Sequence, residues 1–207
     1  EKNLDENTII LFMSDNGGLS ATGRGGTPHT HNLPLKSGKG SMYEGGIREP
    51  MIVLWKGVTQ PASVCDNYVM IDDFFPSIVE MAGYKSPKTI QKIDGKSFVP
   101  YLKGKKENKQ NRSLYFHYPH IWGVNGPGIS LASAIRKGDW KLIYFHKDQH
   151  YELYNIATDI GEKNNLFSTE PKIAKKLANN LGKHLKKVKA QMPIDKASAK
   201  TIPYPGL

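Results

Sequence analysis

The chain has 207 residues, of which 38% are hydrophobic and 23% charged, and its formal net charge is +10. No apolar run reaches the roughly 18 residues of a membrane-spanning helix, so the sequence predicts no membrane span. A basic excess of this size favours anionic partners, although the nine lysines among residues 171–200 are most simply interpreted as the solvated face of a helix.

The first six residues are acidic and polar, and no leader-like apolar segment with a small-residue cleavage site follows them. The chain has no initiator methionine and enters an apolar run almost at once. We therefore expect it to begin inside a larger fold. The single cysteine, Cys65, excludes an intrachain disulfide.

An unbroken apolar run at residues 9–13, within an expected strand at 8–14, stops at the sequence SDNGG. This pattern predicts a buried parallel strand that delivers polar groups to its carboxyl end, where ligands bind in open α/β sheets. Residues 15–46 contain nine glycines and two prolines, which predicts a long functional loop. Residues 51–55 are apolar and of strand length.

A helix is expected over residues 72–82, with Asp72 as its cap, Pro76 in its first turn and Gly83 after its end. A polar connection then leads to the stretch 103–112, which is charged and non-periodic. We place a subdomain boundary there, between residues 105 and 106.

The second half of the chain predicts a small antiparallel sheet covered by one helix. The helix is expected from Pro171 to Gln191, with Ser168 or Thr169 as its cap. Its apolar stripe repeats at helical spacing and consists of Ile173, Leu177, Leu181, Leu185 and Val188. A tight turn at residues 137–139 predicts a hairpin. The expected strands cover residues 114–118, 131–136, 141–145 and 152–154.

Asp15 and Asn16 offer a carboxylate and an amide oxygen, which is a ligand pair suited to a hard cation. The same residues are also typical of an ordinary turn. Lys39 lies between Gly38 and Gly40, so a ligand could approach the backbone closely while the ammonium group attracts an oxyanion. The alternative is a flexible loop lysine.

Glu44 and Arg48 flank a pair of glycines just before the strand at 51–55, and we interpret them as a structural ion pair or backbone brace. His117, His120 and Trp122 are grouped between two expected strands. They could face a ligand or could equally be core aromatics. His29 and His31, in the glycine-rich loop near the lysine, are similar candidates.

The segment 35–50, LKSGKGSMYEGGIREP, together with SDNGG at 14–18, resembles the sulfatase family of the alkaline phosphatase superfamily. The similarity continues through nearly the whole chain. It includes the stretches 72–76, 94–98, 134–143, 152–155 and 161–166.

The resemblance implies an α/β fold. Residues 1–105 would be the C-terminal part of an alkaline-phosphatase-like α/β sheet domain. Residues 106–207 would be a small α+β subdomain of about four antiparallel strands plus one C-terminal helix.

The resemblance also assigns roles to site residues. Asp15 and Asn16 match two ligands of the family's divalent cation, usually calcium and here possibly magnesium. Lys39 matches the lysine that holds an oxygen of the sulfate ester. Glu44 and Arg48 match structural residues of the motif. A substrate pocket is expected at His117, His120 and Trp122, because the C-terminal subdomain of the family commonly contributes substrate contacts. His31 is a further candidate from its position near Lys39 and matches no family position.

Sulfatases use a formylglycine made from a C-x-P-S-R or related segment, and Cys65 lies in VCDN instead. We expect Cys65 to be a buried small hydrophobic residue. The nucleophile and the remaining metal ligands would lie in an N-terminal part of the same enzyme. The chain would then be the C-terminal portion of a sulfatase, inactive alone.

The expected reaction is hydrolysis of sulfate esters of a sulfated carbohydrate, in a periplasmic or secreted protein, with no nucleic-acid partner. Two alternatives stay open. One is a relative that hydrolyses phosphate or phosphonate esters. The other is a non-catalytic module that binds polyanions through its lysine-rich last helix.

Overall fold

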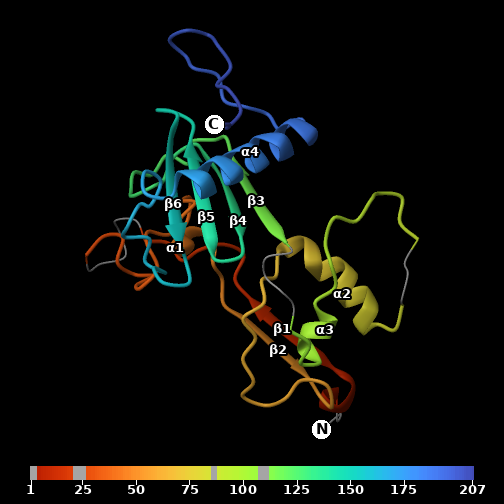
Figure 1. The fold of residues 1–207 in the computed structure, drawn as a ribbon. Helices are drawn as coiled ribbons and strands as arrows, with labels where there is room; N and C mark the ends of the chain where they lie inside the picture. The colour runs from red at the N-terminus through yellow and green to blue at the C-terminus, as the bar shows by residue number, and fades with distance from the viewer. Residues whose placement is uncertain (1–3, 21–26, 85–87, 107–111) are drawn as a thin grey trace. The chain divides into compact units, whose positions relative to one another are not determined.

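The computed structural model describes residues 4–20, 27–84, 88–106 and 112–207 (Figure 1). The contacts divide the chain into two compact units. The first consists of Glu1–Met13 and Pro50–Lys109, and the second of Ser14–Glu49 and Gln110–Leu207. The glycine-rich segment thus groups with the C-terminal half, whereas the sequence analysis placed it in the N-terminal domain. The predicted division into domains stays a prediction.

The first unit contains a two-stranded sheet and short helices. Strand β1 (Ile9–Met13) pairs antiparallel with β2 (Met51–Trp55), with Leu11 opposite Val53. The helical elements are η1 (Leu4–Asn7), η2 (Ile71–Asp73), α2 (Phe74–Met81) and α3 (Val99–Leu102).

The prediction of a buried parallel strand at residues 8–14 is wrong. β1 runs antiparallel to its described neighbour, and the side chains of one face of the pair are 53–64% exposed. An apolar run predicts that both faces are covered, whereas burial along β1 and β2 alternates with the two-residue period of a strand. The exposed face consists of Ile10, Phe12, Ile52 and Leu54.

The start of α2 is fixed by Asp73 rather than by the predicted Asp72. The buried Asp73 carboxylate accepts hydrogen bonds from the backbone N–H groups of Met70 and Lys96, both at 2.8 Å, whereas Asp72 is exposed. Cys65 is also exposed, so its predicted burial is wrong. It lies in an irregular segment that begins after β2 and contains mostly exposed residues up to position 66.

The second unit is built on a four-stranded antiparallel sheet in the order β3-β4-β5-β6. The predicted hairpin turn is present, with Gly138 at a φ of +58° between two of the strands. The strands are β3 (Ser113–Tyr118), β4 (Ala132–Lys137), β5 (Trp140–Phe145) and β6 (His150–Asn155). The bounds of β3, β4 and β5 lie within one residue of their predicted positions, and β6 begins two residues earlier than predicted.

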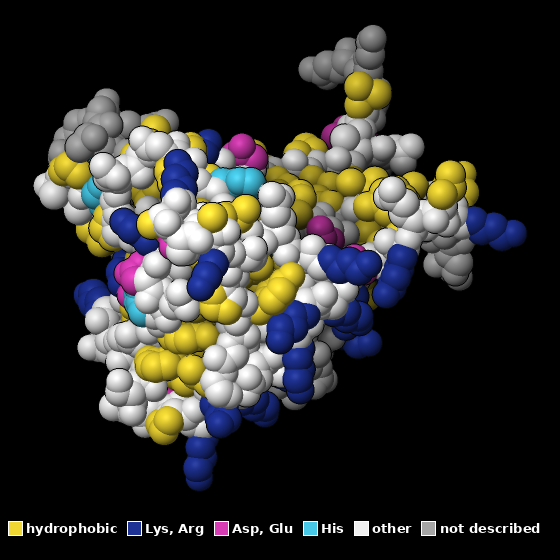
Figure 2. Space-filling model, turned by 90° about the horizontal axis from the view of Figure 1, so that it is seen from above, with side chains coloured by type: hydrophobic (Ala, Val, Ile, Leu, Met, Phe, Trp, Pro, Cys, Tyr) yellow, Lys and Arg dark blue, Asp and Glu magenta, His cyan; other side chains and the backbone are white. Residues whose placement is uncertain are grey.

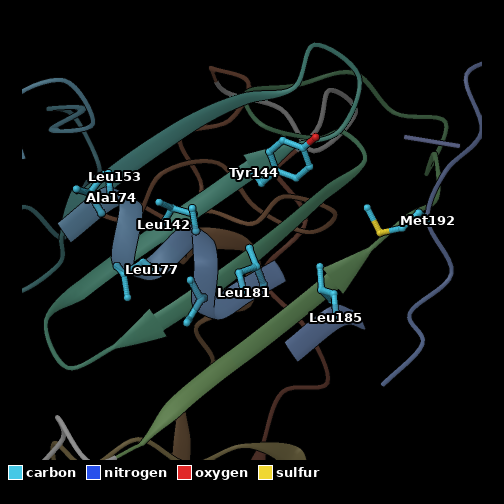
Figure 3. Close-up of a cluster of buried hydrophobic side chains, with 10 residues drawn as sticks. Leu142, Tyr144, Leu153, Ala174, Leu177, Leu181, Leu185 and Met192 are labelled. Carbon is cyan, nitrogen blue, oxygen red and sulfur yellow. The ribbon is translucent and has the colours of Figure 1, made fainter. Parts of the chain in front are cut away.

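Helix α4 (Pro171–Lys187) covers one face of this sheet, as predicted. Figure 3 shows the leucines of the helix directed toward the strands, with Leu142, Tyr144 and Leu153 supplied by the sheet. The opposite face packs against Met42 and Tyr43 of the glycine-rich segment. Since side chains alternate along a strand, the sheet separates these two cores.

The ends of α4 differ from the prediction. Its N-cap is Glu170, without a side-chain capping bond, and it ends at Lys187 rather than at Gln191. Val188 therefore lies beyond the helix and is exposed, whereas Leu177, Leu181 and Leu185 are buried as expected. Figure 2 shows one face of the molecule, from which many Lys and Arg side chains project into solvent.

Candidate functional site

The two glycine-rich stretches of the second unit pack backbone against backbone. The N–H of Gly17 donates to the carbonyl of Gly46 at 3.1 Å, and the N–H of Lys39 donates to the carbonyl of Gly18 at 3.1 Å. A Cβ atom at Gly17 would lie 2.1 Å from the oxygen of Gly45, so only glycine fits there. This contact brings Asn16, three residues after the end of β1, close to the loop that carries the lysine.

The side chain of Asn32 also holds the two glycine-rich stretches together. Its Nδ2 donates to the carbonyl of Gly18 at 2.8 Å and to that of Ser37 at 2.9 Å. Sequence reasoning missed this residue, because nothing in its local sequence shows that it bridges two segments far apart in the chain.

A cavity of about 290 Å³ lies beside these loops. Four of the predicted site residues line it together: Asn16, Lys39, His117 and Trp122. The rest of the wall comes from the GKG loop, from α1 (Glu44–Ile47) and from β3. These other residues are Gly40, Ser41, Met42, Gly46, Ile47, Phe116 and Tyr118.

Lys39 and Trp122 form the most direct pair in this cavity. The Lys39 ammonium lies 5.6 Å from the centroid of the Trp122 ring, within cation–π range. Trp122 packs against Gly40, where a Cβ atom would lie 2.6 Å from Cε3 of the indole and where φ is +89°. The part of the chain that the structure describes offers Lys39 no carboxylate partner, so its charge is available to an anion in the cavity.

His117 lies in the wall of the cavity, but both of its ring nitrogens are already engaged. Nε2 lies 2.9 Å from the backbone oxygen of Gln191, which requires an N–H at Nε2. Nδ1 lies 2.7 Å from Oγ of Ser133, which in turn lies 2.9 Å from Nε2 of the fully buried His146. His117 therefore presents ring surface to the cavity rather than an unoccupied nitrogen.

His146 was missed by the sequence analysis, and its environment keeps it neutral. Burial, together with the neighbouring His117, lowers the pKa of His146 to about 4. The Tyr144 ring also lies edge-on to it, with centroids 5.1 Å apart. The Ser133 hydroxyl has one hydrogen, so it donates to one imidazole and accepts from the other.

The remaining predicted site residues do not line this cavity. His120 is exposed and packs edge-on against Tyr118, with ring centroids 5.9 Å apart. His31 is exposed as well, whereas the related candidate His29 is half-buried and within 3.5 Å of the Ser20 hydroxyl. Asp15 is exposed beside the cavity residue Asn16, whose Nδ2 donates to Oδ1 of Asp15 at 3.1 Å.

Asp15 and Asn16 carry a carboxylate and an amide oxygen, the donor types that suit a divalent cation such as Ca²⁺, although the Asn16 group that faces the Asp15 carboxylate is its amide nitrogen. Glu49 lies near them: burial and the charge of Asp15 both raise the pKa of Glu49. Within the described residues, however, no three His, Cys, Asp or Glu side chains cluster as a metal site. The pair therefore fits as part of a cation site that needs further ligands.

Glu44 belongs to a buried ion network rather than to the cavity surface. Its carboxylate is inaccessible to solvent and lies 2.9 Å from Nη1 of Arg136, 3.1 Å from Nζ of Lys141 and 3.6 Å from Nη1 of Arg48. The ion pair predicted between Glu44 and Arg48 is thus present. Burial opposes ionisation, but Lys141 and Arg136 outweigh it and lower the pKa of Glu44.

Glu162 completes this network from the other side. Its Oε1 lies 2.8 Å from Nζ of Lys141, and its Oε2 accepts a hydrogen bond from the backbone N–H of Glu44 at 2.6 Å. Burial raises the pKa of Glu162, and Lys141 offsets only part of that effect. The network ties α1, which follows the lysine loop, to the central strands of the sheet.

Lys141 was also missed, although the sequence carried a signal for it. It shares a face of β5 with Ile143 and Phe145, because residues two apart point the same way. A lysine on a buried strand face requires a carboxylate partner.

The chain matches the family model described as "N-sulphoglucosamine sulphohydrolase, C-terminal" over residues 37–191. It is 35% identical over 210 residues to a protein of Formosa agariphila named "Sulfatase", covering 97% of this chain and 37% of that protein.

Among solved structures, i-CgsB in complex with k-i-k-neocarrahexaose is similar with a TM-score of 0.71 at 28% identity, over 91% of this chain and 38% of that one. A structure in complex with its substrate D-glucosamine-2-N,6-O-disulfate is similar with a TM-score of 0.68 at 27% identity, over 91% of this chain and 36% of that one. The chain thus spans little more than a third of the length of these relatives.

Proposed function

The chain belongs to the sulfatase family and matches the C-terminal portion of its members, and from this premise we propose that it supplies part of an active site that hydrolyses sulfate esters of a carbohydrate. The observation that carries the proposal is the cavity in which the unpaired Lys39 ammonium, the Asn16 amide and the Trp122 ring lie together. A point charge, a hydrogen-bonding amide and an aromatic ring are the groups that a sulfated sugar needs.

Lys39 is the catalytic residue of this proposal. Its ammonium group would pair with an oxygen of the sulfate ester and neutralise the charge that grows on the sulfuryl oxygens as sulfur is attacked. The backbone bond from Lys39 to Gly18 and the packing of Trp122 on Gly40 hold the loop in place. A preorganised charge of this kind needs little rearrangement during the reaction.

Asp15 and Asn16 would contribute two ligands to a divalent cation, calcium or magnesium, with the remaining ligands outside the chain. When bound, such a cation would polarise a sulfuryl oxygen as a Lewis acid. The chain's own part is to hold the carboxylate and the amide beside the lysine loop, through the contact of Gly17 with Gly46.

Trp122 would bind the sugar ring by stacking. Two structural neighbours were solved with carbohydrates, one of them a disulfated glucosamine that is that protein's substrate. His117 would support the pocket as a wall, because its nitrogens are engaged. His120 and His31 lie outside the cavity lining, so they would contact only a substrate that extends beyond it.

The nucleophile would come from additional sequence. Cys65 is exposed and lies outside any formylglycine motif. One face of β1 and β2 is apolar and exposed, and consists of Ile10, Phe12, Ile52 and Leu54. Further polypeptide that covers this face would explain its composition, which supports the proposal that the active site needs additional sequence. We therefore expect no turnover by these 207 residues alone.

From its membership of the sulfatase family, we propose that the protein is periplasmic or secreted. Within the described residues, no helix is long and apolar enough to cross a membrane.

A binding experiment tests the pocket directly. The chain is titrated with a sulfated monosaccharide and with the same sugar without sulfate, with and without Ca²⁺, and chemical shifts of the indole N–H groups are followed. Sulfate-dependent shifts of the Trp122 signal that disappear in Lys39→Ala are expected. Equal shifts with both sugars, or with Lys39→Ala, would contradict the proposed role of the lysine.

A further inference from the structure

Helix α4 presents a single stripe of lysines to solvent. It contains six lysines and no acidic residue in its 17 positions. At 3.6 residues per turn, the six lie within roughly 120° of the helix circumference, opposite the buried residues. All are exposed. This lysine stripe consists of Lys172, Lys175, Lys176, Lys183, Lys186 and Lys187.

The stripe lacks the compensation that a solvated charged helix usually has. Lysines at i, i+3 and i, i+4 repel one another, as in the pairs of Lys172 with Lys176 and of Lys183 with Lys187. Acidic residues are absent from its first turn, where the helix dipole would favour them. Through the described part of the chain, these ammonium groups form no ion pair, and Lys186 instead lies 5.9 Å from the Tyr204 ring.

The stripe is separate from the cavity that holds Lys39. Helix α4 packs on the sheet face formed by Ile135, Leu142 and Leu153, whereas the segment with Met42 and Tyr43 packs on the other face. None of the six stripe lysines lines the cavity.

We propose that the lysine stripe of α4 is a second anion-binding surface that holds a sulfated polysaccharide away from the active-site cavity. At a rise of 1.5 Å per residue, the stripe extends about 22 Å from Lys172 to Lys187. A linear polyanion could place its negative groups opposite the lysine ammonium groups along such a row. The choice of a sulfated polysaccharide as the occupant rests on the proposed function, whereas the binding of a polyanion rests on the charge pattern alone.

A nucleic acid fits the surface less well. Single-stranded nucleic acids bind where aromatic side chains alternate with basic ones and stack on the bases. The stripe contains no aromatic residue: its only intervening residues near the centre are Asn179 and Asn180. Of the rings beside it, that of His184 is stacked on Tyr115, with ring centroids 3.7 Å apart, and that of Tyr204 lies 5.9 Å from Nζ of Lys186.

The test uses heparin as a soluble sulfated polysaccharide and measures its Kd for the 207-residue chain at several salt concentrations. The stripe variant carries Lys172→Gln, Lys176→Gln, Lys183→Gln and Lys187→Gln. The matched control carries the same charge change in the first unit, at the exposed Lys88, Lys92, Lys103 and Lys105. Lys39→Ala is the third variant.

We expect the stripe variant to raise the Kd at least about tenfold near 0.1 M salt. The dependence of log Kd on log salt should become shallower by roughly three, since fewer counterions are released. The control should change the Kd less than twofold, and Lys39→Ala should raise it by less than the stripe variant does. The stripe variant should also unfold at the same or a higher temperature without heparin, because repulsion is removed. The double variant Lys176→Gln and Lys183→Gln provides the same test while removing two charges from the stripe instead of four.

If the control variant weakened heparin binding as much as the stripe variant does, the effect would be one of net charge, and the proposal would be overturned. Binding that depends on Lys39 but not on the stripe would overturn it while leaving the proposed function intact. Tighter binding of double-stranded DNA or of anionic vesicles than of heparin, at the same salt, would overturn the assignment of a sulfated polysaccharide. Heparin binding that depends on the stripe could be found while Lys39→Ala leaves the binding of a sulfated monosaccharide unchanged. That result would support the proposed anion-binding surface and contradict the proposed function.

Discussion

The carboxylate of Glu44 and the ammonium group of Lys141 lie 3.1 Å apart, and neither side chain is exposed to solvent. Glu162 and Arg136 complete the network around them. Taking charges out of water is costly unless each has a partner, so these groups depend on one another. Their position behind the lysine loop makes them a support of the site rather than part of its chemistry.

The first prediction follows from that dependence. Lys141→Met should lower the free energy of unfolding by about 3–5 kcal/mol, because it leaves Glu162 buried without a cation. Urea unfolding followed by circular dichroism measures the change. Arg48→Gln is the control: Arg48 is 50% exposed and its pair should contribute less than about 1 kcal/mol. Comparable losses in both variants would contradict the assignment of a buried network.

The second prediction concerns the pH dependence of stability. An unfolded histidine titrates near 6.5, whereas burial lowers the pKa of His146 to about 4. Between these values the unfolded chain binds more protons than the folded chain, so stability falls as pH drops from 6.5 toward 4. The full effect is about 3 kcal/mol.

His146→Asn should flatten the stability curve in this window, measured by urea unfolding at each pH. The lowered pKa of Glu44 acts in the same direction but only below its ordinary value of 4.5. Glu162 and Glu49, whose pKa values burial raises above 4.5, act in the opposite direction. The contribution of the histidine between pH 6.5 and 5 is therefore the difference in slope between the unmodified chain and His146→Asn. An unchanged slope there would show that His146 is not held neutral by the fold.

The third prediction concerns the glycine beneath the indole. Gly40→Ala should displace Trp122, because the new Cβ would lie 2.6 Å from Cε3 of its ring. Gly57→Ala is the matched control: its φ of +76° is also positive, but nothing lies within 4 Å. Both variants pay backbone strain of roughly 1 kcal/mol, and only Gly40→Ala should weaken binding of a sulfated sugar. Equal affinities in the two variants would argue against this role of the packing.

The fourth prediction concerns the ring itself. Trp122→Ala should weaken binding of a sulfated sugar at least about tenfold, on the scale of an aromatic stacking contact of about 1–3 kcal/mol. Trp122→Phe should recover part of the loss, because it keeps a ring face. Calorimetric titration of the chain measures both. Equal affinities of the Ala and Phe variants for the sugar would contradict a stacking role for the Trp122 ring.

Local patterns predicted most of the second unit. The strand-like runs between residues 114 and 154, the turn at 137–139 and the helical spacing of Leu177, Leu181 and Leu185 placed the sheet and α4 correctly. Apolar content misled at β1, because a run that is hydrophobic at every position does not specify strand direction or what covers it.

The site was predicted only in part. The motifs at 14–18 and 35–50 identified Asn16 and Lys39, which the structure brings into one cavity. Asn32 and His146 act through partners far along the chain, which no local pattern reveals. The histidines at 31 and 120 were selected for their residue type and their place in loops beside other candidates, and they lie outside the cavity lining.

The central claim is that Lys39 holds the sulfate ester during hydrolysis. The most direct measurement is sulfate release from a sulfated carbohydrate, using this chain joined to the N-terminal part of the Formosa agariphila sulfatase. Lys39→Ala should lower kcat by about 10²–10³, and the 207 residues alone should release no sulfate. Full activity in Lys39→Ala, or turnover by the chain alone, would contradict the account.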